Sequence, residues 1–140
     1  MQVEDPISNP IQVVLRFEEL INSRQPEAIS SFMTPDGEFI DSLGNRIQGR
    51  DKLHSAWTGY FKMVPDYSIS HSEIFAHGNT VAVFGSAQGT FSSSKDGQLA
   101  RENYWKTPAS WRAVVKDGRI SIWQVYADNE PIRAIMRKHS

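Results

Sequence analysis

Two aspartates and one histidine are the side chains of this chain best suited to acid–base chemistry: Asp41, His71 and Asp128. A carboxylate in the wall of a cavity loses solvation, which raises its pKa and lets it exchange protons near neutral pH. An imidazole beside such a carboxylate would form a general base. All three are therefore candidate catalytic residues. The alternatives are structural, because Asp128 would also suit a turn after a strand and His71 an ordinary strand position.

Aromatic side chains provide candidate walls for a binding cavity. They fall on one stripe of a predicted helix and in the last two predicted strands, where the alternative is an ordinary aromatic core. If a cavity exists there, they favour a flat apolar ligand that a few polar groups would orient by hydrogen bonds. The candidate ligand-binding residues are Trp57, Tyr60, Phe61, Trp111, Gln124 and Tyr126.

The segment from Trp105 to Asp128 predicts the β-hairpin that positions Asp128 and the late aromatic residues. Asp117 and Gly118 suit a two-residue turn that needs positive φ, and both flanking runs are rich in Val, Ile, Trp and Tyr. If these two residues form the whole loop, one face is apolar near the turn and polar at its far end, where Asp128 lies. The cross-strand pairs on this face are then Val115–Ile120, Ala113–Ile122, Trp111–Gln124 and Ala109–Tyr126.

The rest of the chain predicts a helix-rich first half and a strand-rich second half. The expected helices span about 10–24, 26–32 and 50–64, and the expected strands about 38–43, 67–75 and 80–91, with a polar turn at 92–97. Thr34 to Gly37 is predicted to break the second helix. This order favours an α+β fold with helices packed on a curved, mostly antiparallel sheet. The domain organisation that we expect is a loose arm at 1–8, one domain at 9–136 and a tail at 137–140.

Composition excludes several classes of function. The 140 residues carry 15 Lys and Arg against 16 Asp and Glu without a basic cluster, so we expect no nucleic-acid partner. No apolar run is long enough to cross a bilayer and the first residues do not resemble a signal peptide, so we expect a cytoplasmic protein without a membrane partner. The chain has no cysteine, and no two histidines have ligand spacing. We therefore expect neither a metal nor a cofactor.

Four segments together resemble the SnoaL-like branch of the nuclear-transport-factor-2-like superfamily, which includes ketosteroid isomerase and polyketide cyclases. The segments are PIQVVLRFEELINSR, PEAISSFM, GEFIDSLGNRIQGRDKLHSAW and WRAVVKDGRISIWQVYADN, and the likeness covers about residues 9–135. The last segment is the most specific, because an apolar strand, a Lys-Asp-Gly turn and a strand that ends near Tyr-x-Asp recur in that branch. The resemblance implies a cone-shaped α+β barrel with a deep cavity.

The resemblance also implies a homodimer formed through the sheet. The second face of the last hairpin supports it, because this face looks largely apolar and would otherwise be open to solvent. Its residues are Val114, Trp123, Val125 and Ala127. The alternative is that Pro131–Met136 folds back over this face.

For the site, the resemblance places Asp128 at the aspartate that ends the last strand of many SnoaL-like sequences, and Asp41 near the general base of ketosteroid isomerase. The hydrogen-bond donors of that isomerase correspond to Phe17 and about Trp111, of which only the Trp111 indole can donate. Steroid isomerisation is therefore not carried over. Two functions stay open. One is cofactor-independent acid–base catalysis on a small apolar substrate, of the isomerase, cyclase, dehydratase or epoxide hydrolase type. The other is a non-catalytic ligand-binding or structural homodimer.

Overall fold

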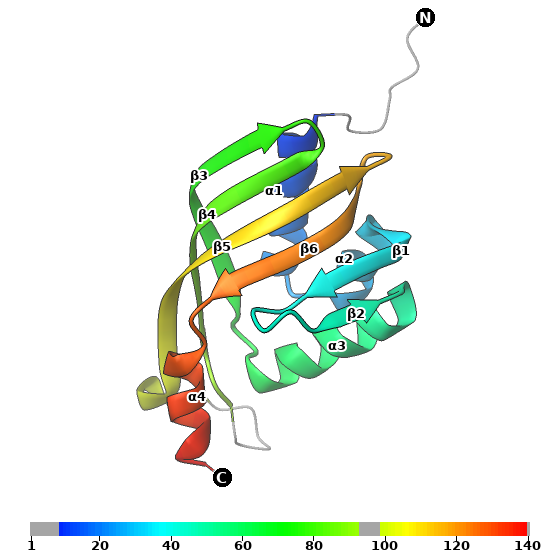
Figure 1. Cartoon of the computed structure of the whole chain (residues 1–140). Coiled ribbons are helices and arrows are strands. Elements are labelled where there is room, and N and C mark those ends of the chain that lie inside the picture. The colour runs from blue at the N-terminus through cyan, green and yellow to red at the C-terminus, as the bar shows by residue number, and fades with distance from the viewer. Residues whose placement is uncertain (1–8, 93–98, 140) are drawn as a thin grey trace, which may run out of the picture.

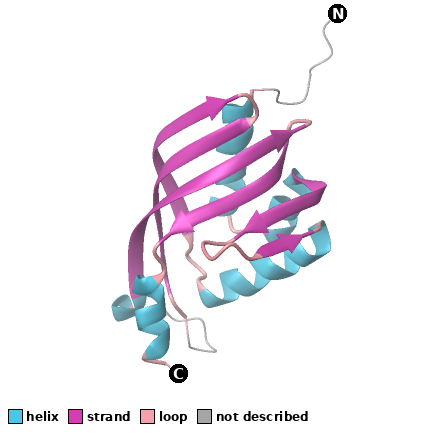
Figure 2. Cartoon of the chain, viewed as in Figure 1, coloured by secondary structure: helices cyan, strands magenta, loops and turns pink. Residues whose placement is uncertain are grey.

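The computed structural model describes residues 9–92 and 99–139, which form a curved six-stranded sheet with helices along one face (Figures 1 and 2). The helices are α1 (Pro10–Asn22), α2 (Pro26–Phe32), α3 (Arg50–Met63) and α4 (Glu130–Arg137), with a short 3-10 helix at Arg101–Asn103. The strands are β1 (Met33–Ile40), β2 (Arg46–Gln48), β3 (Ser68–His77), β4 (Thr80–Thr90), β5 (Tyr104–Lys116) and β6 (Arg119–Ala127).

The sheet has the strand order β2-β1-β6-β5-β4-β3, in which β1 pairs parallel with β6 and the other neighbours are antiparallel. The α+β class and the mostly antiparallel curved sheet that the sequence predicts are confirmed. The sheet is a cone that stays open, because β2 and β3 are its edges and do not pair with each other.

The first helix begins where the sequence predicts. The Asn9 side chain accepts a hydrogen bond of 2.9 Å from the backbone N–H of Ile11, and Pro10 occupies the first turn, where its missing N–H costs nothing. Apolar residues at helical spacing then turn toward the sheet and are fully buried. They are Val13, Val14, Phe17 and Ile21.

The β5–β6 hairpin is confirmed, together with its two-residue turn. Asp117 and Gly118 have φ angles of 54° and 72°, the positive values that this kind of turn requires. Beside the turn, Val115 pairs with Ile120 as the sequence predicts.

Beyond this pair, the predicted register is wrong by one residue. A β-bulge at Ser121, whose hydroxyl donates a 3.1 Å hydrogen bond to the Val114 carbonyl, shifts the strand so that Trp111 faces Val125 and not Gln124. The corrected pairs are Ala113–Trp123, Trp111–Val125 and Ala109–Ala127. The physical reason is burial, because the unbulged register would put the Gln124 amide inside and leave an indole outside.

The bulge in β6 exchanges the residues on the two faces of the strand. Trp123, Val125 and Ala127 face the helices, whereas Gln124 and Tyr126 lie on the opposite, outer face. The prediction that Trp123, Val125 and Ala127 form an apolar outer face is therefore wrong.

The first strand starts earlier than predicted. β1 begins at Met33, and the segment expected to be a turn, Thr34 to Gly37, lies within the strand as an irregularity in its pairing with β6. The short strand β2 was not predicted. Asp41 consequently follows β1 in the β1–β2 turn and does not belong to a strand.

A second bulge interrupts β3. It falls at Ser72 and pairs His71 with Gly85, where the sequence predicted Phe84 or Ser86. A side chain at Gly85 would place its Cβ atom 1.9 Å from the Ser70 carbonyl oxygen, so the two strands approach closely here because this residue is a glycine.

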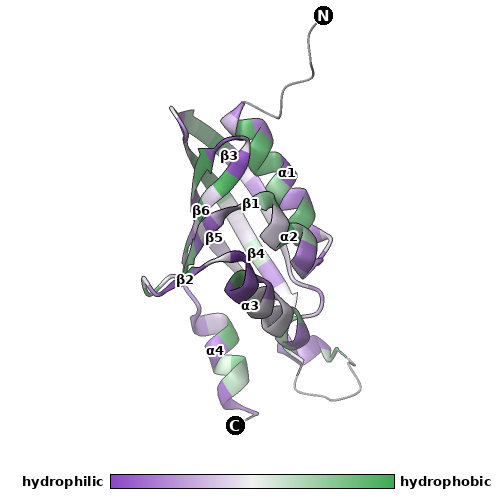
Figure 3. Ribbon diagram, turned by 90° about the vertical axis from the view of Figure 1, so that its right-hand side faces the viewer, coloured by the Kyte–Doolittle hydropathy of each residue, from purple (hydrophilic) through white to green (hydrophobic). Residues whose placement is uncertain are grey.

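The C-terminal segment does not cover the outer face of the sheet. It forms α4 at one end of the sheet, where Ile132 and Ile135 are buried (Figure 1). Viewed from the side, α1, α2 and α3 lie on one face of the sheet, and no helix of the described part of the chain covers the opposite face (Figure 3). Residues 1–8 and most of the predicted turn at 92–97 lie outside the described residues.

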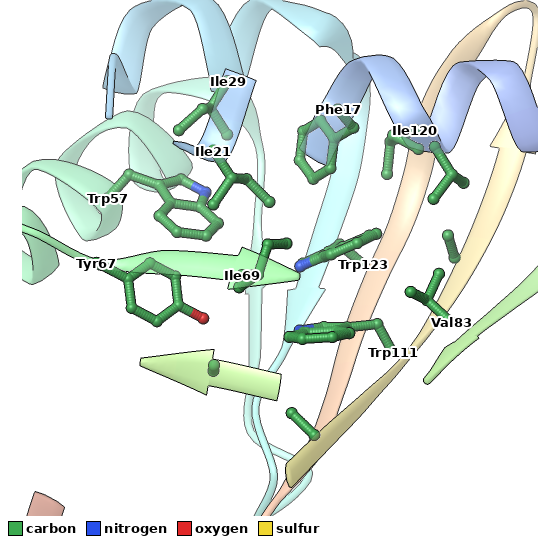
Figure 4. Packing of buried hydrophobic residues seen from close by; sticks show 14 of the residues in the cluster. Phe17, Ile21, Ile29, Trp57, Tyr67, Ile69, Val83, Trp111, Ile120 and Trp123 are labelled. Carbon is green, nitrogen blue, oxygen red and sulfur yellow. The ribbon is translucent and has the colours of Figure 1, made fainter. Parts of the chain in front are cut away.

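The core lies between the helices and the inner face of the sheet (Figure 4). Phe17 of α1 meets Trp123 of β6 edge to face, with ring centroids 5.0 Å apart, and Trp123 stacks on Trp111 of β5 at 6.0 Å. These three rings pack together beneath α1, whereas a cavity remains beneath α3.

Candidate active site

A cavity of about 270 Å³ lies between α3 and the inner face of the sheet. Its wall is built by α3, by the end of β1, the β1–β2 turn and β2, and by residues of β4, β5 and β6. Seven aromatic side chains take part, namely Phe39, Trp57, Tyr60, Tyr67, Trp105, Trp111 and Trp123. Such a cavity, mostly apolar with a few polar groups, is typical of a small-molecule site.

The aromatic rings hold one another in place. Trp57 of α3 meets Phe39 of β1 edge to face at 5.8 Å, and Tyr60 meets Tyr67 at 5.0 Å with the ring planes at 88°. Tyr67 in turn lies 6.2 Å from Trp105 of β5. Because edge-to-face pairs are the favoured aromatic geometry, these contacts stabilise the positions of the rings in the wall.

Burial controls the ionisation of the two tyrosines in this wall. It raises the pKa of Tyr60 and of Tyr67 well above the ordinary phenol value, and for Tyr67 the neighbouring Tyr60 adds to the effect. Both phenols therefore keep their proton and act as neutral hydrogen-bond donors at any physiological pH.

Among the residues that the structure describes, Asp41 is the only carboxylate that lines the cavity. Its Oδ1 accepts 2.9 Å hydrogen bonds from the backbone N–H groups of Leu43 and Asn45, and its Oδ2 accepts one of 3.1 Å from the Asn45 side chain. Burial raises the pKa of Asp41, but the hydrogen bonds from Asn45, Leu43 and Gly44 outweigh it, so the net pKa lies below its usual value. Asp41 is thus an ionised acceptor, and a weaker base than an ordinary aspartate.

A polar contact ties two segments of the cavity wall together. The Asn129 amide donates a 2.7 Å hydrogen bond to the hydroxyl of Ser42, and both residues line the cavity. The hydroxyl of Thr107, a third polar residue of the wall, donates a hydrogen bond of 3.2 Å to the backbone carbonyl of Asp128. These contacts join the β1–β2 turn and β5 to the end of β6.

The predicted ligand-binding residues divide into two groups. Trp57, Tyr60 and Trp111 line the cavity, and Phe61 stacks behind Trp57 with ring centroids 5.4 Å apart. The other two, Gln124 and Tyr126, lie on the outer face of the sheet because of the bulge in β6. There, Gln124 accepts a 3.3 Å hydrogen bond from Arg112.

The predicted catalytic residues do not converge. His71 contacts Glu18 of α1, with its Nδ1 2.9 Å from the carboxylate, and does not line the cavity. Asp128 accepts a 2.9 Å hydrogen bond from the backbone N–H of Glu130, the first residue of α4. This is the structural role that a strand exit suggests. Of the three candidates, Asp41 alone reaches the cavity.

Several wall residues were not among the predicted site residues. Tyr67 and Trp105 carry no local signal beyond aromatic character, and Ser42 and Asn129 occupy turns that meet only in the folded chain. Trp123 could have been found, since a bulge that buries it is the cheaper alternative to burying Gln124.

Two further features concern ligands and membranes. Within the described ranges 9–92 and 99–139, no group of three or more His, Cys, Asp or Glu side chains is arranged to hold a metal ion. No helix in the same ranges is long and apolar enough to span a membrane.

A family model described as a SnoaL-like domain matches residues 14–123 of the chain. No curated protein matches it in sequence. A candidate SnoaL-like polyketide cyclase from Jannaschia Sp. CCS1 has a similar solved structure, with 18% identity, 97% of this chain and 95% of that chain covered, and a TM-score of 0.74.

Two other solved structures are similar. A candidate polyketide cyclase from Xanthomonas campestris pv. campestris has 19% identity, covers 90% of this chain and 96% of its own, and gives a TM-score of 0.77. The third is a hypothetical protein with a ketosteroid isomerase-like fold from Catenulispora acidiphila, solved in complex with trimethylamine. It has 14% identity, the match covers 94% of this chain and 92% of that chain, and the TM-score is 0.75. At these identities the likeness concerns the fold.

Proposed function

Because the chain belongs to the SnoaL-like domain family, we propose that it binds a small, flat, largely apolar molecule in the cavity between α3 and the sheet. The observation that carries this proposal is the aromatic cavity of about 270 Å³. An apolar cavity of about 150 Å³ is enough to bind benzene. The larger cavity therefore suits a molecule of one or two rings.

A cavity-filling substitution tests the proposal. Ala56 of α3 lines the cavity, and its neighbour Ser55 is exposed on the same helix. Calorimetric titration with ethylbenzene should show binding to the wild type and to Ser55→Phe, and strongly weakened binding to Ala56→Phe. Equal binding by both variants would place the ligand elsewhere.

The catalytic form of the proposal assigns proton abstraction to Asp41. Incubation with 2-tetralone in D₂O, followed by NMR, measures the exchange of its acidic C–H protons. Asp41→Asn should slow this exchange to the buffer rate while the ketone still binds. If the wild type itself exchanges no faster than buffer, the non-catalytic alternative holds, which the lowered pKa of Asp41 favours.

The second part of the proposal is a homodimer formed through the outer face of the sheet. This face carries large aromatic side chains about half exposed to solvent, which is unusual for a monomer. They are Phe75 (56% exposed), Phe84 (45%), Tyr104 (49%) and Tyr126 (50%). Charges of both signs lie among them, from Glu73, Lys106 and Arg112. A second copy of the same face complements this mixture, whereas a nucleic acid would require a basic one.

Light scattering after size-exclusion chromatography tests the dimer. The wild type should have twice the chain mass of 15.8 kDa, and Phe84→Asp should have the mass of one chain. Leu43→Asp, which changes an exposed apolar residue of the β1–β2 turn, is the control and should remain dimeric. A monomeric wild type would contradict this part of the proposal. The proposed location of this dimer is the cytoplasm.

A further inference from the structure

The residues that line the cavity differ in their exposure to solvent. Those of the sheet beneath α3, such as Trp111 and Trp123, are buried. The partly exposed ones lie in the β1–β2 hairpin, just after the end of β6 and on α3, and examples are Ser42, Asn129 and Tyr60. Because a buried residue does not reach solvent, the entrance to the cavity lies between these three segments.

One hydrogen bond joins two sides of this entrance. The Asn129 amide, just after β6, donates to the Ser42 hydroxyl in the β1–β2 turn at 2.7 Å, although the two residues are 87 positions apart in the sequence. Figure 1 shows this turn beside the end of β6. Among the residues that the structure describes, it is the one side-chain hydrogen bond that connects the turn to another segment. The position of the turn at the entrance therefore depends on this contact.

The side chain of Asn129 makes this contact in place of a more usual one. Asn129 is the N-cap residue of α4, and an asparagine at that position commonly accepts a hydrogen bond from a backbone N–H of the first helical turn. Here the side chain makes no such bond. The N–H groups at the start of α4 are thus alternative partners for this side chain when its contact with Ser42 opens.

The β1–β2 turn is built so that it can move as a unit. Asp41 accepts hydrogen bonds from the backbone of Leu43 and Asn45, which holds the turn together internally. The strand that follows, β2, has three residues and lies at the edge of the sheet. Between β2 and α3, Gly49 has a φ angle of 97°, which glycine adopts without strain. Leu43 at the tip is 71% exposed, so little apolar contact there opposes movement.

We propose that the β1–β2 turn is a gate to the cavity, which the hydrogen bond between Ser42 and Asn129 keeps closed. The inference rests on the proposed small-molecule function of this cavity and adds how the ligand enters and leaves. When the bond breaks, the turn and β2 move away from the end of β6 about Gly49, and the ligand passes between them. A bound ligand contacts Ile47 of β2, which lines the cavity, and so favours the closed position. Loss of the bond should therefore accelerate release more than entry.

The rates of ligand exchange test the gate. All four tryptophans line the cavity, and azulene, a flat apolar molecule of two rings, absorbs light in the range in which indoles emit. Stopped-flow quenching of tryptophan fluorescence by azulene therefore measures both rates. Ser42→Ala should release azulene about five-fold faster, the effect of one ordinary hydrogen bond, and bind it about two-fold faster. Asn129→Ala and the double variant should give the same rates, because all three lack the same bond.

Faster entry is the result that separates a gate from a plain wall contact. Removal of a contact that only completes the wall would speed release and leave entry unchanged or slower. Ser55→Ala removes an exposed hydroxyl from α3 and is the control, with both rates expected at the wild-type values. Unchanged or slower association in Ser42→Ala and Asn129→Ala, with azulene still bound, would overturn the gate and leave the proposed function standing. A wild type that does not bind azulene would overturn both.

Discussion

The carboxylate of Asp41 accepts hydrogen bonds from both the backbone N–H and the side-chain amide of Asn45, at 2.9 and 3.1 Å. The two residues thereby close the turn between β1 and β2. Asp41, the predicted catalytic residue that lines the cavity, is therefore also the residue that stabilises the turn in which it lies. Its ionised form is the one that the turn stabilises, which determines how stability depends on pH.

Replacement of Asp41 by Asn should lower the free energy of unfolding at pH 7 by about 1 kcal/mol, because a partly solvated charged acceptor is exchanged for a neutral one. The folded-state pKa of Asp41 is below the ordinary 3.8, so its contribution to stability is complete above that value and disappears as pH falls through the folded pKa. Urea denaturation from pH 2 to 8 measures the difference between wild type and variant. The exposed Asp36→Asn is the control, and a difference that grows at low pH would contradict this role.

Replacement of Asp128 by Ala should destabilise the protein by about 0.5–1 kcal/mol, through loss of one hydrogen bond to the start of α4. Ethylbenzene binding should be unchanged, because Asp128 does not line the cavity. Asn129→Ala provides the contrast, since it removes the link to Ser42 in the cavity wall and should weaken binding. The measurements are thermal unfolding and calorimetric titration. Weakened binding by the Asp128 variant would restore it as a site residue.

The contact between His71 and Glu18 should contribute little to stability and nothing to ligand binding. The two side chains are 32% and 16% exposed, and a partly solvated pair of this kind is worth up to about 1 kcal/mol. A double-mutant cycle with His71→Gln and Glu18→Gln measures the coupling. A coupling well above that value, or a loss of ligand binding in either variant, would show that this pair does more than connect α1 to β3.

Gly85→Ala should destabilise the protein by about 3 kcal/mol or prevent folding, because its Cβ atom would collide with the backbone of Ser70 and His71. Gly59→Ala is a matched control in α3, where nothing lies within 4 Å of the added atom. Alanine is the better helix former, so this variant should gain about 0.5–1 kcal/mol. Chemical denaturation compares the two. Tolerance of Gly85→Ala would mean that the bulge in β3 relaxes easily.

The fold could be predicted from local patterns, and the details of the site could not. The cap at Asn9 and the turn at Asp117 and Gly118 depend on a few adjacent residues, and both are confirmed. The orientation of Gln124 depends on one inserted residue, Ser121, whose effect is decided by which side chains the whole sheet can bury.

The site residues show the same division. Trp57 and Tyr60 follow from the apolar stripe of one helix, so their place in the cavity could be predicted. Asp41, which the sequence predicts in a strand, lines the cavity from the turn between β1 and β2. Tyr67 and Trp105 come together only through tertiary packing, and no spacing in the sequence brings them side by side.

The parallel pairing of β1 with β6 has a consequence for the order in which the protein can fold. Phe39 of β1 pairs with Trp123 of β6, although the two residues lie far apart in the sequence. The strand that completes the cavity wall, β6, is therefore synthesised after most of the chain. Contacts of such long range form slowly, and until they form β1 lacks its main neighbour in the sheet. A growing chain on the ribosome therefore cannot acquire the binding site before β6 emerges, and a truncation within β6 should yield an aggregating protein without a cavity.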